Sequence, residues 1–171
     1  MALVGFGGSR SLSPAWAGLV GRVVVAVARA GRGVAVCSGA GASALVRQAW
    51  QAALVFSPSF AGRGALPARA SACVRACAAA GPGSAWVAFV SGPCPTGVMP
   101  ARAWRSGRPA SGSWSEVALA VGLGLPVVVF WCAPGSAVLP SWGGAWAPAG
   151  RGVWAAGWRF VLAASLSLTN I

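Results

Sequence analysis

The sequence lacks most of the residue types that enzymes use for acid–base chemistry. It contains no histidine, lysine, aspartate or tyrosine, and Glu116 is its single carboxylate side chain among 171 residues. This excludes a Ser-His-Asp triad, a Cys-His zinc site, a catalytic carboxylate pair and a carboxylate cage for magnesium or calcium. We therefore expect no metal and no cofactor, and any catalysis would depend on Glu116, arginine, serine, cysteine and backbone amides.

Charge of either sign is scarce, yet its balance is strongly positive. Only 8% of the residues are charged, all 13 basic residues are arginine, and the net charge is +12. A basic balance of this size favours an anionic partner such as a nucleotide, a nucleic acid or an acidic surface. The alternative, that the charges only keep a very apolar chain in solution, stays open at this point.

The cysteine count argues against a disulfide framework. Five cysteines are present, and an odd number with no signal-peptide pattern at the start of the sequence is typical of a reducing cytoplasm. Cys73 and Cys77 lie four residues apart, which would place both on one face of a helix. Two thiols without further ligands favour small buried residues over a metal site.

High hydropathy raises the question of a membrane span. The mean hydropathy is +0.71, and residues 117–140 carry no charge. Gly122, Gly124 and Pro126 divide this stretch into a helix-like half and a Val-Val-Val-Phe-Trp half. We expect a buried helix followed by a buried parallel strand, because such strands read as continuous apolar runs.

Short apolar runs alternate with helical patterns along the first 132 residues. The runs at 2–4, 34–37, 52–56, 85–90 and 125–132 indicate strands, and the intervening segments from Ser13 and from Pro67 indicate helices. Alternation of this kind predicts an α/β fold: a three-layer, Rossmann-like parallel sheet of about five or more strands with helices on both faces. We expect one domain over 1–132.

Residues 133–171 form a tryptophan-, glycine- and proline-rich C-terminal extension, which we expect to pack on the same domain. It would form a hairpin with a short closing helix, or dock across the sheet. Its tryptophans favour burial of apolar surface over stacking on nucleic-acid bases.

Two small-residue loops follow the first two predicted strands. The first is Gly5-Phe6-Gly7-Gly8-Ser9-Arg10 and the second is Ser38-Gly39-Ala40-Gly41-Ala42-Ser43. Glycines allow a tight turn with free amides, and a helix N-terminus favours anions. Because consecutive parallel strands end at one sheet edge, the loops should converge. The candidate anion-binding residues are Gly7, Gly8, Ser9, Arg10, Gly39, Gly41 and Ser43.

A third loop, Ser111-Gly112-Ser113-Trp114-Ser115-Glu116, opens a predicted helix over 112–123 and places Glu116 in its first turn. A carboxylate there also stabilises the helix dipole, which is an alternative explanation for Glu116. The preceding stretch, 91–110, carries Arg102, Arg105 and Arg108. It is either a basic flap over a bound phosphate or a mobile, solvated loop.

Together these motifs resemble the SLOG superfamily of Rossmann-like nucleotide-binding domains, which includes DprA-like (Smf) proteins and LOG-type, "lysine decarboxylase-like" phosphoribohydrolases. The resemblance covers roughly residues 2–131 and depends on three short segments. They are Gly7-Gly8-Ser9-Arg10, Gly41-Ala42-Ser43, and Ser111 to Glu116, where Ser113 takes the place of threonine in the family's Gly-Thr-x-x-Glu. The chain departs from the family where Arg108-Pro109-Ala110-Ser111 replaces Pro-Gly-Gly-x, and where Ser43 replaces the aspartate of DprA-like members.

The resemblance implies binding of a nucleotide or nucleotide-derived phosphorylated ligand, with Gly112 and Ser113 added to the phosphate-binding residues and Glu116 accepting a hydrogen bond from ribose. The alternative enzyme is a phosphoribohydrolase-like N-glycosidase, with Glu116 catalytic and Arg10 or Arg75 anchoring phosphate. DprA-like binding of single-stranded nucleic acid is a third possibility. The apolar excess also predicts a homo-oligomer.

Overall fold

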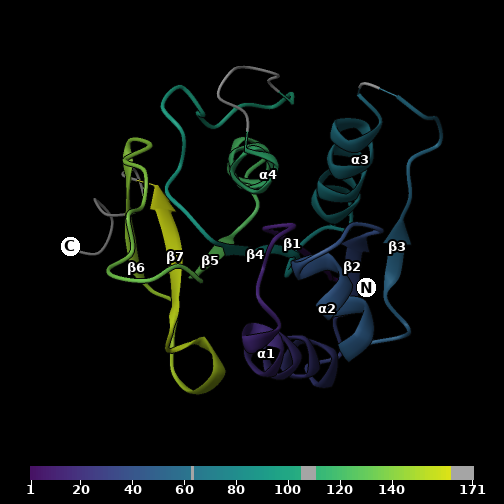
Figure 1. Ribbon diagram of the computed structural model, residues 1–171, viewed down its shortest axis with the longest axis horizontal. Coiled ribbons are helices and arrows are strands. Elements are labelled where there is room, and N and C mark those ends of the chain that lie inside the picture. The colour runs from purple at the N-terminus through teal and green to yellow at the C-terminus, as the bar shows by residue number, and fades with distance from the viewer. Residues whose placement is uncertain (63, 105–110, 163–171) are drawn as a thin grey trace.

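A computed structural model describes residues 1–62, 64–104 and 111–162 and shows an α/β fold in which a central sheet lies between two helical layers (Figure 1). The parallel part of the sheet contains β1 (Leu3–Gly8), β2 (Gly33–Cys37), β3 (Leu54–Phe56), β4 (Ala85–Val90) and β5 (Val127–Trp131). The helices are α1 (Ala17–Arg29), α2 (Ala42–Ala49), α3 (Ala65–Ala79) and α4 (Gly112–Gly122). The predicted three-layer, Rossmann-like fold is confirmed.

The strand order places the point at which the chain reverses direction across the sheet between β1 and β4. Within the described residues the order is β3-β2-β1-β4-β5-β7-β6, and β1 pairs in parallel with both β2 and β4. The chain adds strands on one side of β1 up to β3 and then crosses to the other side at β4. In open α/β sheets this switch point, at the carboxyl ends of the strands, is where ligands bind.

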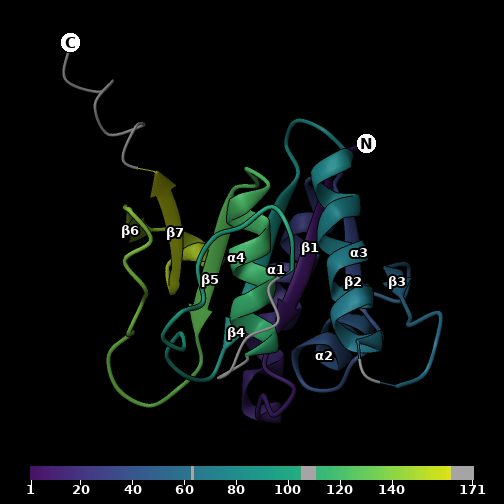
Figure 2. The same cartoon turned by 90° about the horizontal axis from the view of Figure 1, so that it is seen from above.

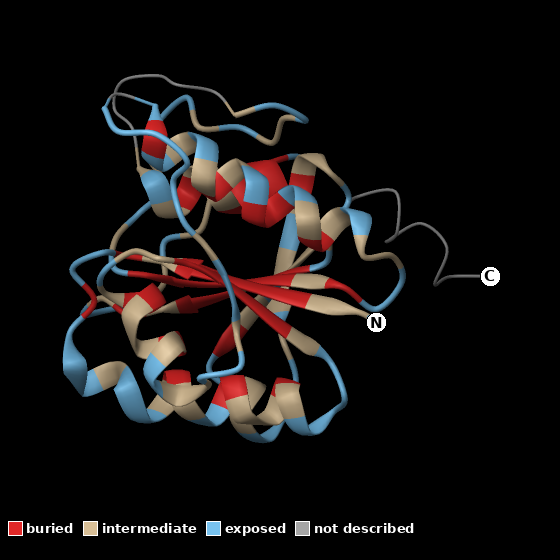
Figure 3. Cartoon of the chain, turned by 90° about the vertical axis from the view of Figure 1, so that its right-hand side faces the viewer, coloured by how far each residue is buried: buried red, intermediate tan, exposed pale blue. Residues whose placement is uncertain are grey.

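Side chains on β1 alternate between two unlike environments. Val4 and Phe6 point toward α1 and join an apolar cluster with the helix valines Val20, Val23, Val24 and Val27. Gly5 and Gly7 face α3 and α4, whose cluster contains the side chains of Trp86, Trp114 and three cysteines. Buried residues line both faces of the sheet in Figure 3.

The glycines of β1 have a different role from the one expected. The loop prediction began at Gly5, but the strand continues to Gly8 and the turn begins at Ser9. A Cβ at Gly5 would overlap the Trp86 ring, and one at Gly7 would overlap the Glu116 carboxyl. Glycine within a strand often marks such a close approach. These two glycines therefore allow the Trp86 ring and the Glu116 carboxyl to pack directly against the backbone of β1.

Two helix starts also differ from the sequence-based expectation. Helix α3 begins at Ala65, two residues before Pro67, because proline fits anywhere in the first helical turn. Helix α4 begins at Gly112 after the N-cap Ser111, whose hydroxyl accepts from the Trp114 amide at 3.4 Å. Glu116 is therefore in the second turn, not the first. The dipole effect is concentrated in the first turn, so it no longer explains this carboxyl.

The C-terminal extension continues the sheet. Strands β6 (Gly144–Pro148) and β7 (Gly157–Leu162) pair with each other antiparallel, and β7 pairs antiparallel with β5 (Figure 2). Trp142 is buried and lies edge-on to Trp114 and Phe160, so burial accounts for it. The expected hairpin is present, no α-helix closes it within the described residues of the extension, and residues 163–171 lie outside the described ranges.

No helix in the described part of the chain has the length and apolarity needed to cross a membrane. The uncharged stretch 117–140 divides as expected, with most of α4 in its first half and β5 in its second.

Candidate functional site

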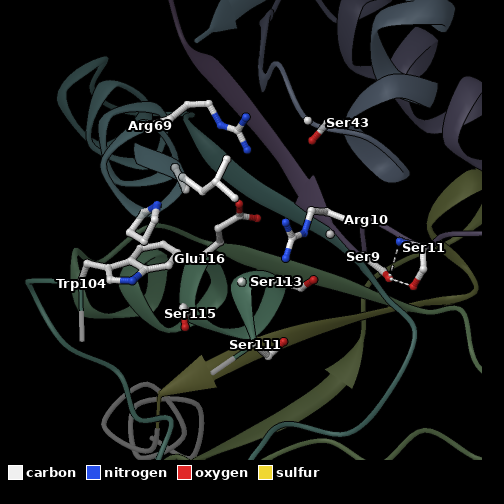
Figure 4. Close-up of a pocket in the computed structure, with 16 residues that line it drawn as sticks. Ser9, Arg10, Ser11, Ser43, Arg69, Trp104, Ser111, Ser113, Ser115 and Glu116 are labelled. Carbon is white, nitrogen blue, oxygen red and sulfur yellow. Dashed lines mark hydrogen bonds between the residues drawn. The ribbon is translucent and has the colours of Figure 1, made fainter. Parts of the chain in front are cut away.

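A cavity of about 810 Å³ opens at the carboxyl edge of the sheet, beside the switch point (Figure 4). Its walls come from the loops after β1 and β2, from the first turns of α3, and from the N-terminal half of α4. Its volume lies in the range of small-molecule sites. The lining residues are Gly8, Ser9, Arg10, Ser11, Gly39, Ser43, Leu66, Pro67, Arg69, Ala70, Trp104, Ser111, Gly112, Ser113, Ser115 and Glu116.

The structure brings most of the predicted site residues to this cavity. Those that line it are Gly8, Ser9, Arg10, Gly39, Ser43, Gly112, Ser113 and Glu116. Gly7 is not in the lining but lies directly against the Glu116 carboxyl. Gly41 caps α2, and Arg75 is elsewhere, donating to the Arg102 carbonyl oxygen at 2.8 Å. The structure therefore gives Arg75 a position away from the cavity.

The first two loops meet because Gly41 permits them to. Its φ is 59°, in the region that favours glycine, and a Cβ there would overlap the Ser9 carbonyl oxygen and the Arg10 backbone. This close approach lets the Ala42 amide donate to the Ser9 carbonyl oxygen at 3.0 Å. The N-terminus of α2 is thus joined to the loop that carries Arg10.

Ser9 anchors a small network of hydroxyl groups. Its side chain is 9% exposed, receives a hydrogen bond from Ser91 at 2.7 Å, and lies 3.1 Å from the Ser11 hydroxyl oxygen. A second cavity of about 160 Å³ borders Ser9, Ser111 and Ser113, so it adjoins the main one. The hydroxyl groups give this end of the site polar atoms that either donate or accept.

Arg69 is the cation that the sequence analysis missed. It lines the cavity from the second turn of α3, and its Nη1 donates to the Ser38 hydroxyl at 3.4 Å. Arg75 is six residues further along the same helix, or about 9 Å further from the cavity end. Because α3 follows β3, its first turns must lie at the carboxyl edge of the sheet, and this rule would have favoured Arg69.

The Glu116 carboxyl is held at the floor of the cavity. The residue as a whole is half-buried, but its Oε2 is fully buried and has no hydrogen-bond partner among the described residues. Burial raises the pKa of the Glu116 carboxyl well above its ordinary value, and the Cys37 thiol acts in the same direction. The Arg69 guanidinium and the Gly8 amide lower the pKa but do not offset burial. Burial therefore favours the neutral, protonated form of Glu116.

Three buried thiols lie beneath this floor. Cys37 ends β2, Cys73 and Cys77 face it from α3, and all three are free and buried in the same apolar cluster. A hydrogen bond from Cys73 lowers the pKa of the Cys37 thiol, with Arg69 and Arg47 assisting. No group of three or more histidine, cysteine or acidic residues in the described ranges is arranged to hold a metal ion.

Residues 91–104 form an arm that is fixed along its length by side chains. Trp114 Nε1 donates to the Gly92 carbonyl oxygen at 2.9 Å, and Trp142 Nε1 donates to that of Val98 at 2.8 Å. The Arg75 bond to Arg102 holds the far end. The arm brings Trp104 to the cavity wall. This part of the loop is thus a built wall, whereas Arg105 and Arg108, assigned to a basic flap, fall outside the described residues.

The arrangement suits an anionic ligand with an apolar part. Arg10, Arg69 and the N-terminal residues of α4 face the cavity, and burial favours the neutral form of its one acid, Glu116. Trp104 lies across Glu116 from Ser9 and Ser11 (Figure 4). Family models, curated proteins and solved structures were all searched for relatives of this chain, and none of them matches.

Proposed function

We propose that the chain binds a nucleotide or nucleotide-derived phosphorylated ligand in the cavity at the carboxyl edge of the sheet. The observation that carries this proposal is the charge of the cavity. It presents Arg10, Arg69 and the N-terminus of α4, and burial favours the neutral form of its one carboxyl, Glu116. Guanidinium groups and helix N-termini are both well suited to phosphate.

The size of the cavity, and the presence of both apolar and polar groups in its walls, favour a nucleotide over a bare anion. About 810 Å³ is more than inorganic phosphate fills. Trp104 and Leu66 provide apolar surface in the wall, against which a base can stack, and the serines provide partners for ribose hydroxyls. The order of the three motifs supports membership of the SLOG superfamily, which we propose on the same grounds.

A thermal-shift screen of the full chain against nucleoside mono-, di- and triphosphates tests the proposal, followed by titration calorimetry on any hit. The matched pair of variants is Arg10→Ala, which changes the cavity, and Arg29→Ala, at an exposed position in the last turn of α1 outside the cavity lining. We expect Arg10→Ala to weaken binding about tenfold or more, as expected for loss of a charged hydrogen bond, and Arg29→Ala to leave it unchanged. A folded protein that shifts with no nucleotide would contradict the proposal.

The same titration separates a pocket from a nucleic-acid surface. Affinity that stays constant from a mononucleotide to longer oligonucleotides indicates a pocket. Affinity that grows with oligonucleotide length and falls steeply with salt indicates a track along the phosphate backbone. We expect the first pattern, because the cations in question converge on one cavity.

One observation favours a second candidate, an N-glycosidase. A neutral acid at the cavity floor can protonate a leaving base while water attacks the anomeric carbon and restores the proton to Glu116. Glu116→Gln would then abolish release of base from nucleoside monophosphates while binding remains. Base release that survives this substitution would exclude the role.

A further inference from the structure

Two cavity-lining groups have buried polar atoms that the protein leaves without a partner. Among the described residues, Arg69 Nε and Glu116 Oε2 are both buried and make no hydrogen bond. Buried polar atoms are normally paired, and an unpaired one costs about 1–3 kcal/mol. The other such atoms, the indole nitrogens of Trp86 and Trp131, are not in the cavity lining.

Arg69 and Glu116 both line the cavity, although Arg69 Nε and Glu116 Oε2 themselves are closed to solvent. Arg69 is fixed through Nη1 to Ser38, and the Glu116 carboxyl lies against Gly7, where any side chain would displace it. Figure 4 shows the Glu116 carboxyl between the guanidinium groups of Arg69 and Arg10. A single small ligand group in the cavity can therefore reach both residues through their remaining polar atoms.

The charges around Glu116 are those of the Arg69 and Arg10 guanidinium groups and of the Cys37 thiol, whose negative charge opposes ionisation of the carboxyl. Arg69, Cys73 and Cys77 face it from α3, Cys37 from β2 and Arg10 from the loop after β1. The β4 and β5 segments contribute no titratable side chain. The buried, unpaired Oε2 and the raised pKa both favour the protonated form of this carboxyl, and a protonated carboxyl has an O–H group to donate.

We propose that Arg69 and Glu116 together form the subsite for one oxyanion of the ligand, with Arg69 as the cationic donor and Glu116 as a neutral acid that donates its O–H. The subsite rests on the proposed function, and it gives the phosphate group of the proposed ligand a position in the cavity. The ligand group is a phosphate, free or carried on a nucleotide. In this role Glu116 does not accept from ribose, because its hydrogen is directed at the anion.

The subsite makes ligand binding depend on a proton. Where Glu116 is ionised in the free protein, the incoming anion is repelled until the carboxyl takes one proton from solvent. Ligand affinity therefore falls as pH rises through the range in which Glu116 ionises, and binding in that range takes up a proton.

Sulfate is the probe that isolates this effect, because its own charge is constant from pH 5 to pH 9, and AMP reports on the nucleotide-borne group. Both are titrated calorimetrically into the full chain across that range, in two buffers of different ionisation enthalpy. We expect native affinity for sulfate to fall by up to about tenfold per pH unit where Glu116 ionises, with uptake of up to one proton per sulfate.

Three variants test which residue causes the pH dependence of sulfate binding. Glu116→Gln keeps a donor but cannot titrate, so sulfate affinity should be flat with pH and stay within about threefold of the native low-pH value. Cys37→Ala should keep a pH dependence, displaced to lower pH because this thiol helps to raise the pKa of Glu116, and its persistence excludes the thiol as the titrating group. Arg69→Met should weaken sulfate binding about tenfold or more at every pH.

The outcomes distinguish this inference from the proposed function. Failure of native protein to bind either sulfate or AMP at any pH overturns both. AMP and sulfate binding that does not vary with pH, or that varies equally in Glu116→Gln, overturns the subsite and leaves nucleotide binding standing. If the protein binds sulfate more tightly than AMP, the group that the subsite recognises is free phosphate and not a phosphate carried on a nucleotide.

Discussion

The two faces of the sheet have the same supporting strands but unlike contents. On the α1 side, β1 presents Val4 and Phe6 to a layer of helix valines, and the cluster contains apolar side chains only. On the α3–α4 side, the same strand presents Gly5 and Gly7, and the space above them holds Trp86 and the Glu116 carboxyl.

This difference shows how a chain with a single acid builds a site for it. The side chains of Val4 and Phe6 make a core on one face, and the glycines at positions 5 and 7 leave room on the other face for Trp86 and for groups from α3 and α4. The polar site therefore lies where β1 has no side chains, one residue away from a position in the apolar core. Substitutions on the two sides should have separable effects.

The largest expected loss of stability is on the apolar side. Phe6 is fully buried, so Phe6→Ala should lower the free energy of unfolding by about 3–5 kcal/mol, through lost burial and the cavity left behind. The fraction that remains folded should bind AMP with native affinity, because no cavity-lining residue is changed. Urea denaturation and calorimetry measure the two quantities, and a weakened affinity would show that the faces are not independent.

Gly7→Ala should have the opposite balance of effects, with a smaller loss of stability than Phe6→Ala and a loss of ligand binding. The added methyl group overlaps the Glu116 carboxyl and the Trp86 ring, which predicts a loss of about 1–3 kcal/mol and loss of AMP binding. The control is Gly18→Ala on the exposed face of α1, where helix propensity predicts a gain of about 0.5–1 kcal/mol and unchanged binding. Native affinity in Gly7→Ala would contradict the packing of Glu116 on this strand.

Glu116→Gln should alter how stability varies with pH. The folded-state pKa of Glu116 is raised above the ordinary value of 4.5, so the folded state holds a proton that the unfolded state releases. Stability should thus fall as pH rises from 4.5 toward the folded pKa, by at most about 1.4 kcal/mol per pH unit. The glutamine variant should lose this component and be more stable at pH 8. Identical thermal unfolding profiles against pH would contradict a buried neutral acid.

Ser91→Ala should have the smallest effect. It removes the 2.7 Å hydrogen bond to the Ser9 hydroxyl, which predicts a loss of about 1 kcal/mol. Ser9 keeps its contacts with Ser11, so AMP affinity should change by no more than about threefold. A loss of affinity comparable to that in Arg10→Ala would mean that the serine network itself binds the ligand.

Much of the fold followed from the sequence because it depends on local patterns. Short apolar runs, several of them bounded by glycine, located all five parallel strands, and the helical spacing of Val20, Val23 and Val27 located α1. The convergence of the first two loops also followed, because parallel strands share an edge. These features depend on side-chain periodicity and chain direction, which a single sequence contains.

What the sequence did not reveal depends on contacts between distant segments. Gly5 and Gly7 resemble a turn because their partners, Trp86 and Glu116, are about 80 and 110 residues away. The sequence pattern placed the start of α3 at Pro67, two residues after its observed start, and it favoured Arg75 over Arg69 for this reason. Trp104 reaches the cavity only because the arm is fixed by indole groups from α4 and from the C-terminal extension.

The hydrogen bond from Trp142 to the Val98 carbonyl oxygen joins the C-terminal extension to the arm that brings Trp104 to the cavity wall. Thermodynamic linkage makes this connection reciprocal: a ligand that stabilises the arm also stabilises the packing of the extension, and detachment of the extension weakens the site. Protection of the C-terminal segment against proteolysis would then report occupancy of a pocket to which that segment contributes no lining residue.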